Sequence, residues 1–228
     1  MTMLVSLAMI LLTIIIYLLM VRLYNKIHIP LLVPIATSST AIIAVLLMFH
    51  IPYQTFMLGG KWIDELLGPA VVALAYPLYQ HRKTLQKFAL SIVASALAGT
   101  IIGLISGILL SSLFGIDQKQ ILSLAPKSVT TPVAMDIASM IGGNPTLSAV
   151  YVMVAGMFGA MFGPYVLKVF RIRHPISIGI GFGTASHGIG TAKAGENGEL
   201  AGAIGSITMT LSALFASLLC PMIVHLFM

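Results

Sequence analysis

The stretch PKSVTTPVAMDIASMIGG, from Pro126 to Gly143, decides the organisation of this chain because it places polar residues between two strongly apolar segments. An ionisable group at the centre of a bilayer costs roughly 2.5 to 3.5 kcal/mol, so it normally faces a cavity or a partner rather than lipid. The stretch therefore predicts a functional site inside a membrane, held by the rest of the chain.

The first part of this stretch has the groups that bind an anion. Thr131 and Pro132 predict a helix start, with the threonine as the N-cap. Free N–H groups and the positive dipole end at a helix start attract anions. Lys127 adds a charge and the hydroxyls add donors. We expect an anion site formed by Lys127, Ser128, Thr130 and Thr131. The alternative for Lys127 is an interfacial lysine that reaches the lipid headgroups.

A second stretch of similar composition, GTASHGIGTAKA, extends from Gly183 to Ala194 and combines small residues, hydroxyls, one histidine and one lysine. Histidine titrates near neutral pH, so His187 is a candidate proton carrier, and a hydrogen-bonded structural histidine is the alternative. The predicted substrate-binding residues of this stretch are Ser186, His187, Thr191 and Lys193.

Asp136 is the second candidate for proton coupling, because carboxylates inside membranes are functional by default. Pairing with Lys127 or Lys193, or bonding to the backbone, is the alternative reading. Asn144 and Pro145 predict the N-terminal cap of the next helix.

The composition excludes a soluble domain. Of 228 residues, 58% are hydrophobic and only 8% are charged, and the mean hydropathy is +1.04, whereas soluble domains have about 25% charged residues. The apolar runs are continuous rather than alternating, which favours helices over a barrel. We expect a single all-α polytopic membrane domain over residues 1–228. It should have about six to eight transmembrane helices of bilayer length, with two broken or re-entrant segments.

Several classes of site have no support in the sequence. Cys220 is the one cysteine, so no intramolecular disulfide can form, and the six histidines are scattered singly without zinc-site spacing. Ser186 and His187 are adjacent, so on a helix they do not face each other, and no Gly-x-Ser-x-Gly elbow is present. We therefore expect no enzyme, metal, cofactor or nucleic-acid partner, and the run from Leu4 to be an uncleaved helix.

The basic residues predict the topology, because short cytoplasmic loops have an excess of Lys and Arg. The clusters are Arg22/Lys26, Arg82/Lys83/Lys87 and Arg171/Arg173. All three lie inside only if the stretch 126–143 enters and leaves by the outer face. By the same logic Gly179 to Ala194 re-enters from the cytoplasmic face, and many secondary transporters form a substrate site where two such segments meet. Two crossing helices are the alternative.

Other features concern packing and connections. Gly99, Gly103 and Gly107 recur every fourth residue and predict close helix packing, within or between subunits. Residues His50 to Glu65 are expected to form an amphipathic loop, and Leu66 to Gln80 a proline-containing span. The similarity of Pro69–Ala75 to Pro132–Ala138 suggests inverted repeats.

Four segments resemble the LrgB/CidB family over essentially the whole chain. They are PKSVTTPVAM at 126–135, GTASHGIGTAKA at 183–194, GPAVVALAYPLY at 68–79 and GGNPTLSAVYVMVAGMFGAMFG at 142–163. Gly188 departs from a frequent alanine, and the family pattern does not require Asp136, which weakens the latter as an essential coupling residue. Members are known as holin-like or antiholin-like modulators of murein hydrolase activity and autolysis, and they act with a small LrgA/CidA partner.

The resemblance also implies a substrate. A plastid relative is a glycolate/glycerate translocator, and bacterial pairs have been linked to pyruvate uptake. The first hypothesis is therefore a transporter of small monocarboxylates in the bacterial inner membrane, forming a homo-oligomer and working with an LrgA/CidA-like membrane partner. A holin-like or antiholin-like pore or regulator is the second hypothesis. The third hypothesis is a scaffold for the partner. In that case the glycine stripe, which consists of Gly99, Gly103 and Gly107, matters more than Lys127.

Overall fold

The computed structural model describes residues 2–27, 29, 32–66, 69, 72–73 and 75–227, and within these ranges it contains helices and no strands. Four of the described helices are long and apolar enough to cross a bilayer. They are α1 (Thr2–Ile27), α7 (Ala89–Leu113), α10 (Pro145–Val169) and α12 (Glu199–Phe227). Many of their large apolar side chains are exposed, as lipid contact requires. The predicted all-α membrane fold is confirmed.

The remaining predicted spans are shorter or more polar. Helix α2 (Pro34–Met48) is apolar but has 15 residues. Helix α11 (Pro175–Gly195) has 21 residues but is not apolar enough to count among the four. A total of six to eight spans therefore stays a prediction. The segments 66–80 and 69–75, a predicted span and a possible repeat, lie partly outside the described residues, and α5 (Ala75–Gln80) is the last part of the first segment.

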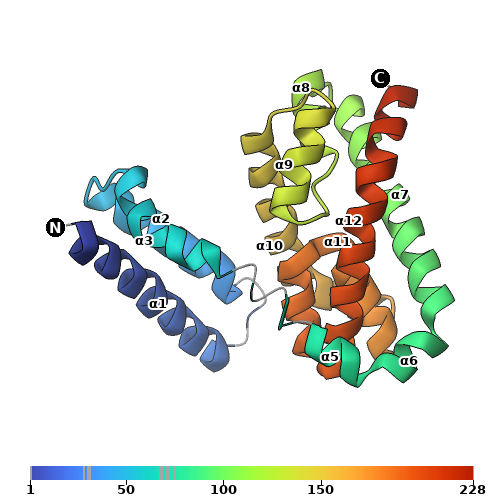
Figure 1. Ribbon diagram of the computed structural model, residues 1–228, viewed down its shortest axis with the longest axis horizontal. Coiled ribbons are helices and arrows are strands. Elements are labelled where there is room, and N and C mark those ends of the chain that lie inside the picture. Colours follow the sequence, from blue (N-terminus) through green and yellow to red (C-terminus); the bar gives the residue numbers. More distant parts are fainter. Residues whose placement is uncertain are drawn as a thin grey trace. The chain divides into compact units, whose positions relative to one another are not determined.

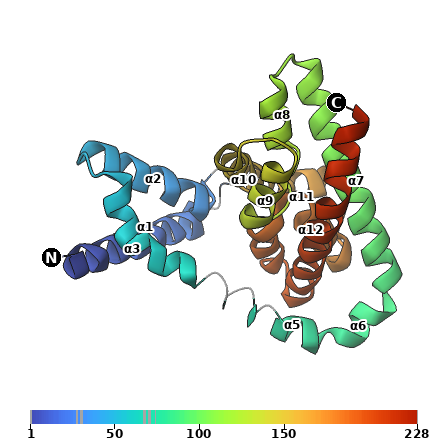
Figure 2. The same cartoon turned by 45° about the horizontal axis from the view of Figure 1, so that its top comes forward.

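The chain divides into two compact units, residues 1–75 and 76–228, and the single domain stays a prediction. In the first unit α1 contacts both α2 and α3 (Tyr53–Glu65), as can be followed in Figure 2. The expected loop over 50–65 is thus wrong, since most of it is helix α3. Gly59 lets this helix approach α1 closely, and there the Ser6 hydroxyl donates a hydrogen bond to the Leu58 carbonyl at 2.7 Å.

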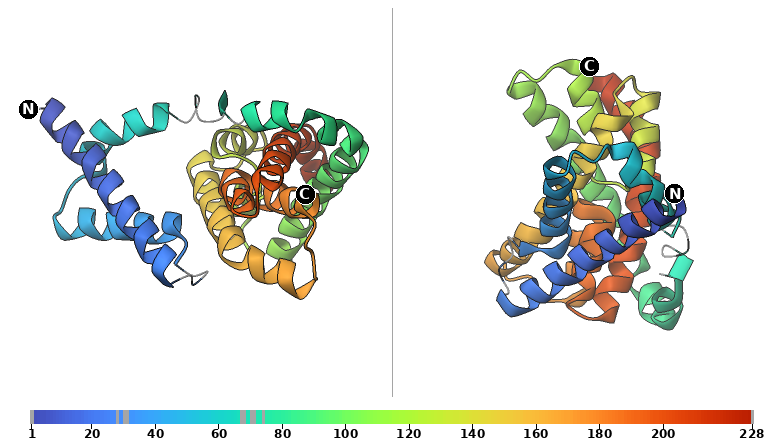
Figure 3. Two further views of the ribbon diagram at one scale, coloured as in Figure 1. Left: turned by 90° about the horizontal axis from the view of Figure 1, so that it is seen from below. Right: turned by 90° about the vertical axis from the view of Figure 1, so that its left-hand side faces the viewer.

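In the second unit, α11 and α12 pack against each other, with α10 on one side and α7 on the other (Figure 1; Figure 3, left). The shorter helices are α6 (Arg82–Lys87), α8 (Gln118–Leu124) and α9 (Thr131–Met140). Helices α8 and α9 with the loop between them form the first hairpin, residues 118–140, and the loop 125–130 is its tip. This unit contains both polar stretches identified in the sequence.

The first hairpin reverses the direction of the chain. The Ser123 hydroxyl donates to the Lys119 carbonyl and accepts a hydrogen bond from the Asn144 amide at 2.7 Å, so the exit of the hairpin lies beside its first helix. The Asn144 side chain accepts from the Leu147 amide, which confirms the predicted cap of α10. Because α7 ends and α10 begins at this end, both helices run the length of the unit in opposite directions (Figure 1).

Helix α11 is a second hairpin, residues 175–195, rather than a straight helix. Ser186 and His187 have non-helical backbone angles, and His187 has a φ of 42°. Gly190 lies against the Phe182 carbonyl, and Ile178 and Ala194 belong to one buried cluster. In a straight helix residues 178 and 194 would lie about 24 Å apart, at 1.5 Å per residue. The chain therefore turns back at residues 186–187.

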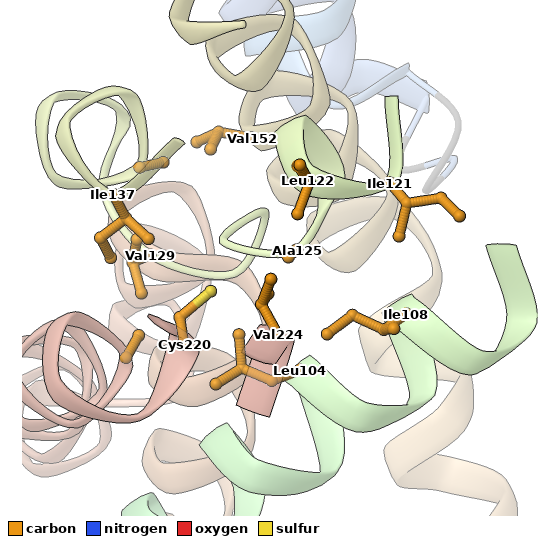
Figure 4. Packing of buried hydrophobic residues seen from close by; sticks show 12 residues of the cluster. Leu104, Ile108, Ile121, Leu122, Ala125, Val129, Ile137, Val152, Cys220 and Val224 are labelled. Carbon is orange, nitrogen blue, oxygen red and sulfur yellow. The ribbon is translucent and has the colours of Figure 1, made fainter. Parts of the chain in front are cut away.

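The two hairpins enter the second unit from opposite ends. Residues 82–87 precede α7 and residues 171–173 follow α10, so both basic clusters lie at the end where α11 begins (Figure 1). The first hairpin comes from the other end and is held by a buried cluster that includes Leu104, Val129 and Cys220 (Figure 4). Two reversing segments from opposite ends agree with the predicted re-entrant arrangement.

Candidate functional site

The two hairpins meet at a small cavity, which we call the inter-hairpin cavity. Its lining residues are Thr100 and Leu104 of α7, Ala125, Pro126, Ser128 and Val129 of the tip, Thr184 of α11, and Ser212 and Ala216 of α12. Its volume is about 10 Å³, which is barely enough to hold a single water. The hydroxyls of Thr100, Ser128, Thr184 and Ser212 are its polar groups. The two hairpins therefore come together around a small cavity to which four hydroxyl-bearing residues contribute.

Lys127 lies in the tip between two residues that line the cavity. Its Nζ atom donates a hydrogen bond to the Gly103 carbonyl of α7 at 3.2 Å. The ion pair found in the described part of the chain joins Lys193 to Glu196, so no carboxylate there neutralises Lys127. Among the described residues its hydrogen-bond partner is a carbonyl, so the Lys127 amino group has further N–H donors to offer an anion.

The glycine stripe of α7 faces the polar stretches. A Cβ atom at position 99 would lie 2.8 Å from Cγ2 of Thr184, and one at position 107 would lie 2.7 Å from Nζ of Lys127. At Gly103 the nearest such atom is Oγ of Ser128, at 3.7 Å. These glycines thus let both hairpins approach α7 within the subunit, which is one of the two packing alternatives. Their importance for packing stays a prediction.

The start of α9 differs by one residue from the prediction. The helix begins at Thr131, and the N-cap is Thr130, which has extended backbone angles, while Pro132 occupies the first turn. The predicted cap at Thr131 is therefore wrong, because residue 131 already has helical geometry. Within the described residues, no side-chain hydrogen bond caps this helix start. The hydroxyls of Thr130 and Thr131 belong to half-buried residues beside Lys127, but they do not line the cavity.

Ser186 and His187 form the turn of the second hairpin and point towards α10. The Nε2 atom of His187 lies 2.9 Å from the Val152 carbonyl, and the ring also contacts Gly156. Ser186 packs on Gly159. Both side chains are buried but neither lines the inter-hairpin cavity. A structural contribution of His187 is thus visible, while its predicted proton transfer is untested.

The other predicted residues of the second hairpin lie farther along it. Thr191 is buried against Gly205 of α12, and its hydroxyl lies 4.0 Å from the sulfur of Met209. Lys193 forms an ion pair with the exposed Glu196 at 2.6 Å. Neither residue lines the cavity, so the structure separates the donors of this stretch into distinct environments.

Asp136 is exposed on α9 and forms no ion pair within the described ranges. The alternative in which it pairs with Lys127 or Lys193 is therefore not realised in this state. Among the described residues no group of three or more His, Cys, Asp or Glu side chains could hold a metal ion.

Sequence reasoning missed two of the four hydroxyl-bearing residues of the cavity, Thr100 and Ser212. Thr100 has one signal, its position directly after Gly99 of the stripe. Ser212 has none, because it is one of five hydroxyl residues in α12, namely Ser206, Thr208, Thr210, Ser212 and Ser217. Thr184 belongs to the second polar stretch, but only the fold distinguishes it from its neighbours.

Comparison with known proteins gives a match to the family model described as LrgB-like family over residues 13–226. The chain is 48% identical over 223 residues to a Bacillus subtilis (strain 168) protein named YxaC, covering 98% of this chain and 97% of that protein. It is 36% identical to the holin-like protein CidB of Staphylococcus epidermidis (strain RP62A) and 37% identical to that of Staphylococcus aureus (strain Mu50). These matches cover 96% and 97% of both chains, respectively. No solved structure matches significantly.

Proposed function

The chain belongs to the LrgB-like family and is a multi-pass bacterial membrane protein, and we propose that it transports small monocarboxylates of the pyruvate, glycolate and glycerate class. The environment of Lys127 supports this proposal most directly. Lys127 is a half-buried cation without a carboxylate partner in the described chain, and it lies next to a cavity with four hydroxyls. Such a combination suits a small anion with further polar groups.

The closed cavity is consistent with a carrier. A monocarboxylate needs several times the volume of one water, so binding requires the tip to separate from α7 and α12. The two hairpins come from opposite ends of the unit, and separation at one end or the other would expose the cavity to one side at a time. This is the arrangement that alternating access requires. His187 and Asp136 are proposed to transfer any coupled proton.

A second candidate function is a holin-like pore or regulator, which the names of the relatives favour. Under this proposal the protein acts on autolysis as a homo-oligomer with a small LrgA/CidA-like membrane partner. The two candidates differ in one respect that can be measured, since a carrier saturates and discriminates among solutes, whereas a pore leaks solutes of mixed charge. Neither candidate includes an enzymatic step.

The test is uptake of radiolabelled pyruvate, glycolate and glycerate into proteoliposomes that contain this protein alone, with and without a pH gradient. The variant is Lys127→Gln, and Lys119→Gln is the control because it removes an exposed lysine from the same hairpin. Release of trapped sucrose and carboxyfluorescein is followed in parallel.

Saturable uptake that Lys127→Gln abolishes and Lys119→Gln preserves would support the carrier with its anion site at the tip. Equal uptake by Lys127→Gln and the unaltered protein would remove Lys127 from the site. Release of both trapped solutes without saturable uptake would favour the pore, and reconstitution with the partner would then be the next step.

A further inference from the structure

Ser212 is the exceptional hydroxyl of α12. The other four serine and threonine hydroxyls of this helix each donate to the carbonyl four residues earlier, at 2.8 to 3.0 Å. Among the residues that the structure describes, the Ser212 hydroxyl has no hydrogen-bond partner, although the residue is only 1% exposed. A buried polar group without a partner is unfavourable, and natural structures rarely retain one without a reason.

The position of Ser212 supplies that reason. Its side chain lines the inter-hairpin cavity together with Ser128 and Thr184, one residue from each polar stretch. Thr100 and Thr184 donate their hydroxyl protons to the carbonyls of Ala96 and Ile180 in their own helices. Towards the cavity, these two oxygens can therefore act as acceptors but not as donors.

The donors that a carboxylate needs must then come from the remaining hydroxyls. A carboxylate accepts hydrogen bonds and donates none when it is ionised. The Ser212 proton is uncommitted, and no hydrogen bond of the Ser128 hydroxyl is found in the described part of the chain. The two lie on α12 and on the first hairpin, so an anion between them would join the tip to the helix behind it.

We propose that the Ser212 hydroxyl donates a hydrogen bond to the carboxylate of the transported anion, opposite Ser128. This assignment rests on the proposed transport function. It adds α12 to the site, which the polar stretches by themselves do not include. It also explains why a helix whose other hydroxyls bond to its own backbone leaves one buried hydroxyl unused.

The closing experiment measures the KM and Vmax of monocarboxylate uptake in proteoliposomes for Ser212→Ala. Ser206→Ala is the matched control, because Ser206 is buried on the same helix but bonds to the Gly202 carbonyl. Loss of one hydrogen bond to an ionised group should raise KM about tenfold or more for Ser212→Ala. KM should stay within about twofold of the unaltered value for Ser206→Ala, whose hydroxyl does not face the cavity.

A stability measurement separates this role from a structural one. Removing an unpartnered buried hydroxyl should leave the thermal unfolding midpoint unchanged or raise it, whereas a structural hydroxyl would lower it. A raised KM without loss of thermal stability supports the proposal. An unchanged KM overturns the assignment of Ser212, and so does a raised KM that accompanies a lower midpoint. Neither outcome affects the proposal that the unaltered protein is a transporter. Absence of saturable uptake by the unaltered protein overturns both the transport function and this assignment.

Accessibility gives a second, independent readout. Ser212→Cys in a Cys220→Ala background has a single thiol, since Cys220 is the one native cysteine. If the cavity opens to admit substrate, a small water-soluble thiol reagent should label this cysteine in membranes, and the transported anion should slow the labelling several-fold. Labelling that the anion does not slow, or no labelling of protein that still transports, contradicts a substrate contact at this position.

Discussion

The Nζ atom of Lys127 lies 2.7 Å from the position that a Cβ atom of residue 107 would occupy. Glycine at 107 therefore makes room for the ammonium group that the transport proposal depends on. The two residues are 20 positions apart and belong to different elements, α7 and the tip of the first hairpin. Their contact connects the glycine stripe to the predicted anion site.

Gly107→Ala should displace the lysine and impair anion uptake. The obstructing atom is the end of a flexible side chain, so the fold should survive at a cost of about 1 kcal/mol, towards the low end for overpacking. We expect uptake to fall about tenfold, because the charge leaves its position beside the tip. Gly103→Ala is the control, since the nearest atom there is 3.7 Å away. Equal uptake by the two variants would contradict the link between Gly107 and Lys127.

The contact between Gly159 and Ser186 should be required for folding of the second hairpin. A methyl group at position 159 would overlap the Ser186 side chain, which is buried at the turn. We expect Gly159→Ala to lower the free energy of unfolding by about 1 to 3 kcal/mol. Gly181→Ala should have little effect because, in the described part of the chain, no atom beyond its own helical turn lies within 4 Å of its Cβ position. Thermal unfolding in detergent checks both, and matching midpoints would disprove the expectation.

Backbone strain at His187 can be tested by comparing the stabilities of two substitutions that remove its side chain. With a φ of 42° and a ψ of −135°, this residue has a conformation that glycine adopts readily and other residues adopt at a cost of about 1 to 3 kcal/mol. His187→Gly and His187→Ala both lose the contact with the Val152 carbonyl. The glycine variant should therefore be the more stable by about 1 to 2 kcal/mol. Denaturant unfolding of the two variants measures this difference, and a more stable alanine variant would show that the turn is not strained.

Ser123 should stabilise the first hairpin at its open end. Its hydroxyl accepts from the Asn144 amide at 2.7 Å, and Ser123→Ala would leave that amide unpaired at a cost of about 1 to 3 kcal/mol. Ser217→Ala, which removes a hydroxyl bonded only within α12, is the comparison. Limited proteolysis between residues 114 and 145 should be faster for Ser123→Ala. Cleavage at the same rate in both variants would argue against this role.

The membrane class, the helical fold and the reversal at residues 126–143 could be predicted from the sequence, because they depend on local properties. Continuous apolar runs must satisfy their backbone hydrogen bonds within helices. Basic residues orient the loops. Asn144 followed by Pro145 is a local capping signal, and the structure confirms it. Residues 50–65 show the limit of such reasoning, since most of them form helix α3, which packs against α1.

The sequence by itself determined that Lys127 and the surrounding hydroxyls lie in a polar segment of a membrane protein. Only the tertiary structure decided which hydroxyls share a cavity. His187 and Thr191, which were predicted from the sequence, do not line that cavity, whereas Thr100 and Ser212, which were not predicted, do. The physical reason is that a side chain's environment depends on which helices pack together. Periodicity along one helix cannot distinguish Ser212 from Ser206, whereas contact with the tip of the first hairpin does.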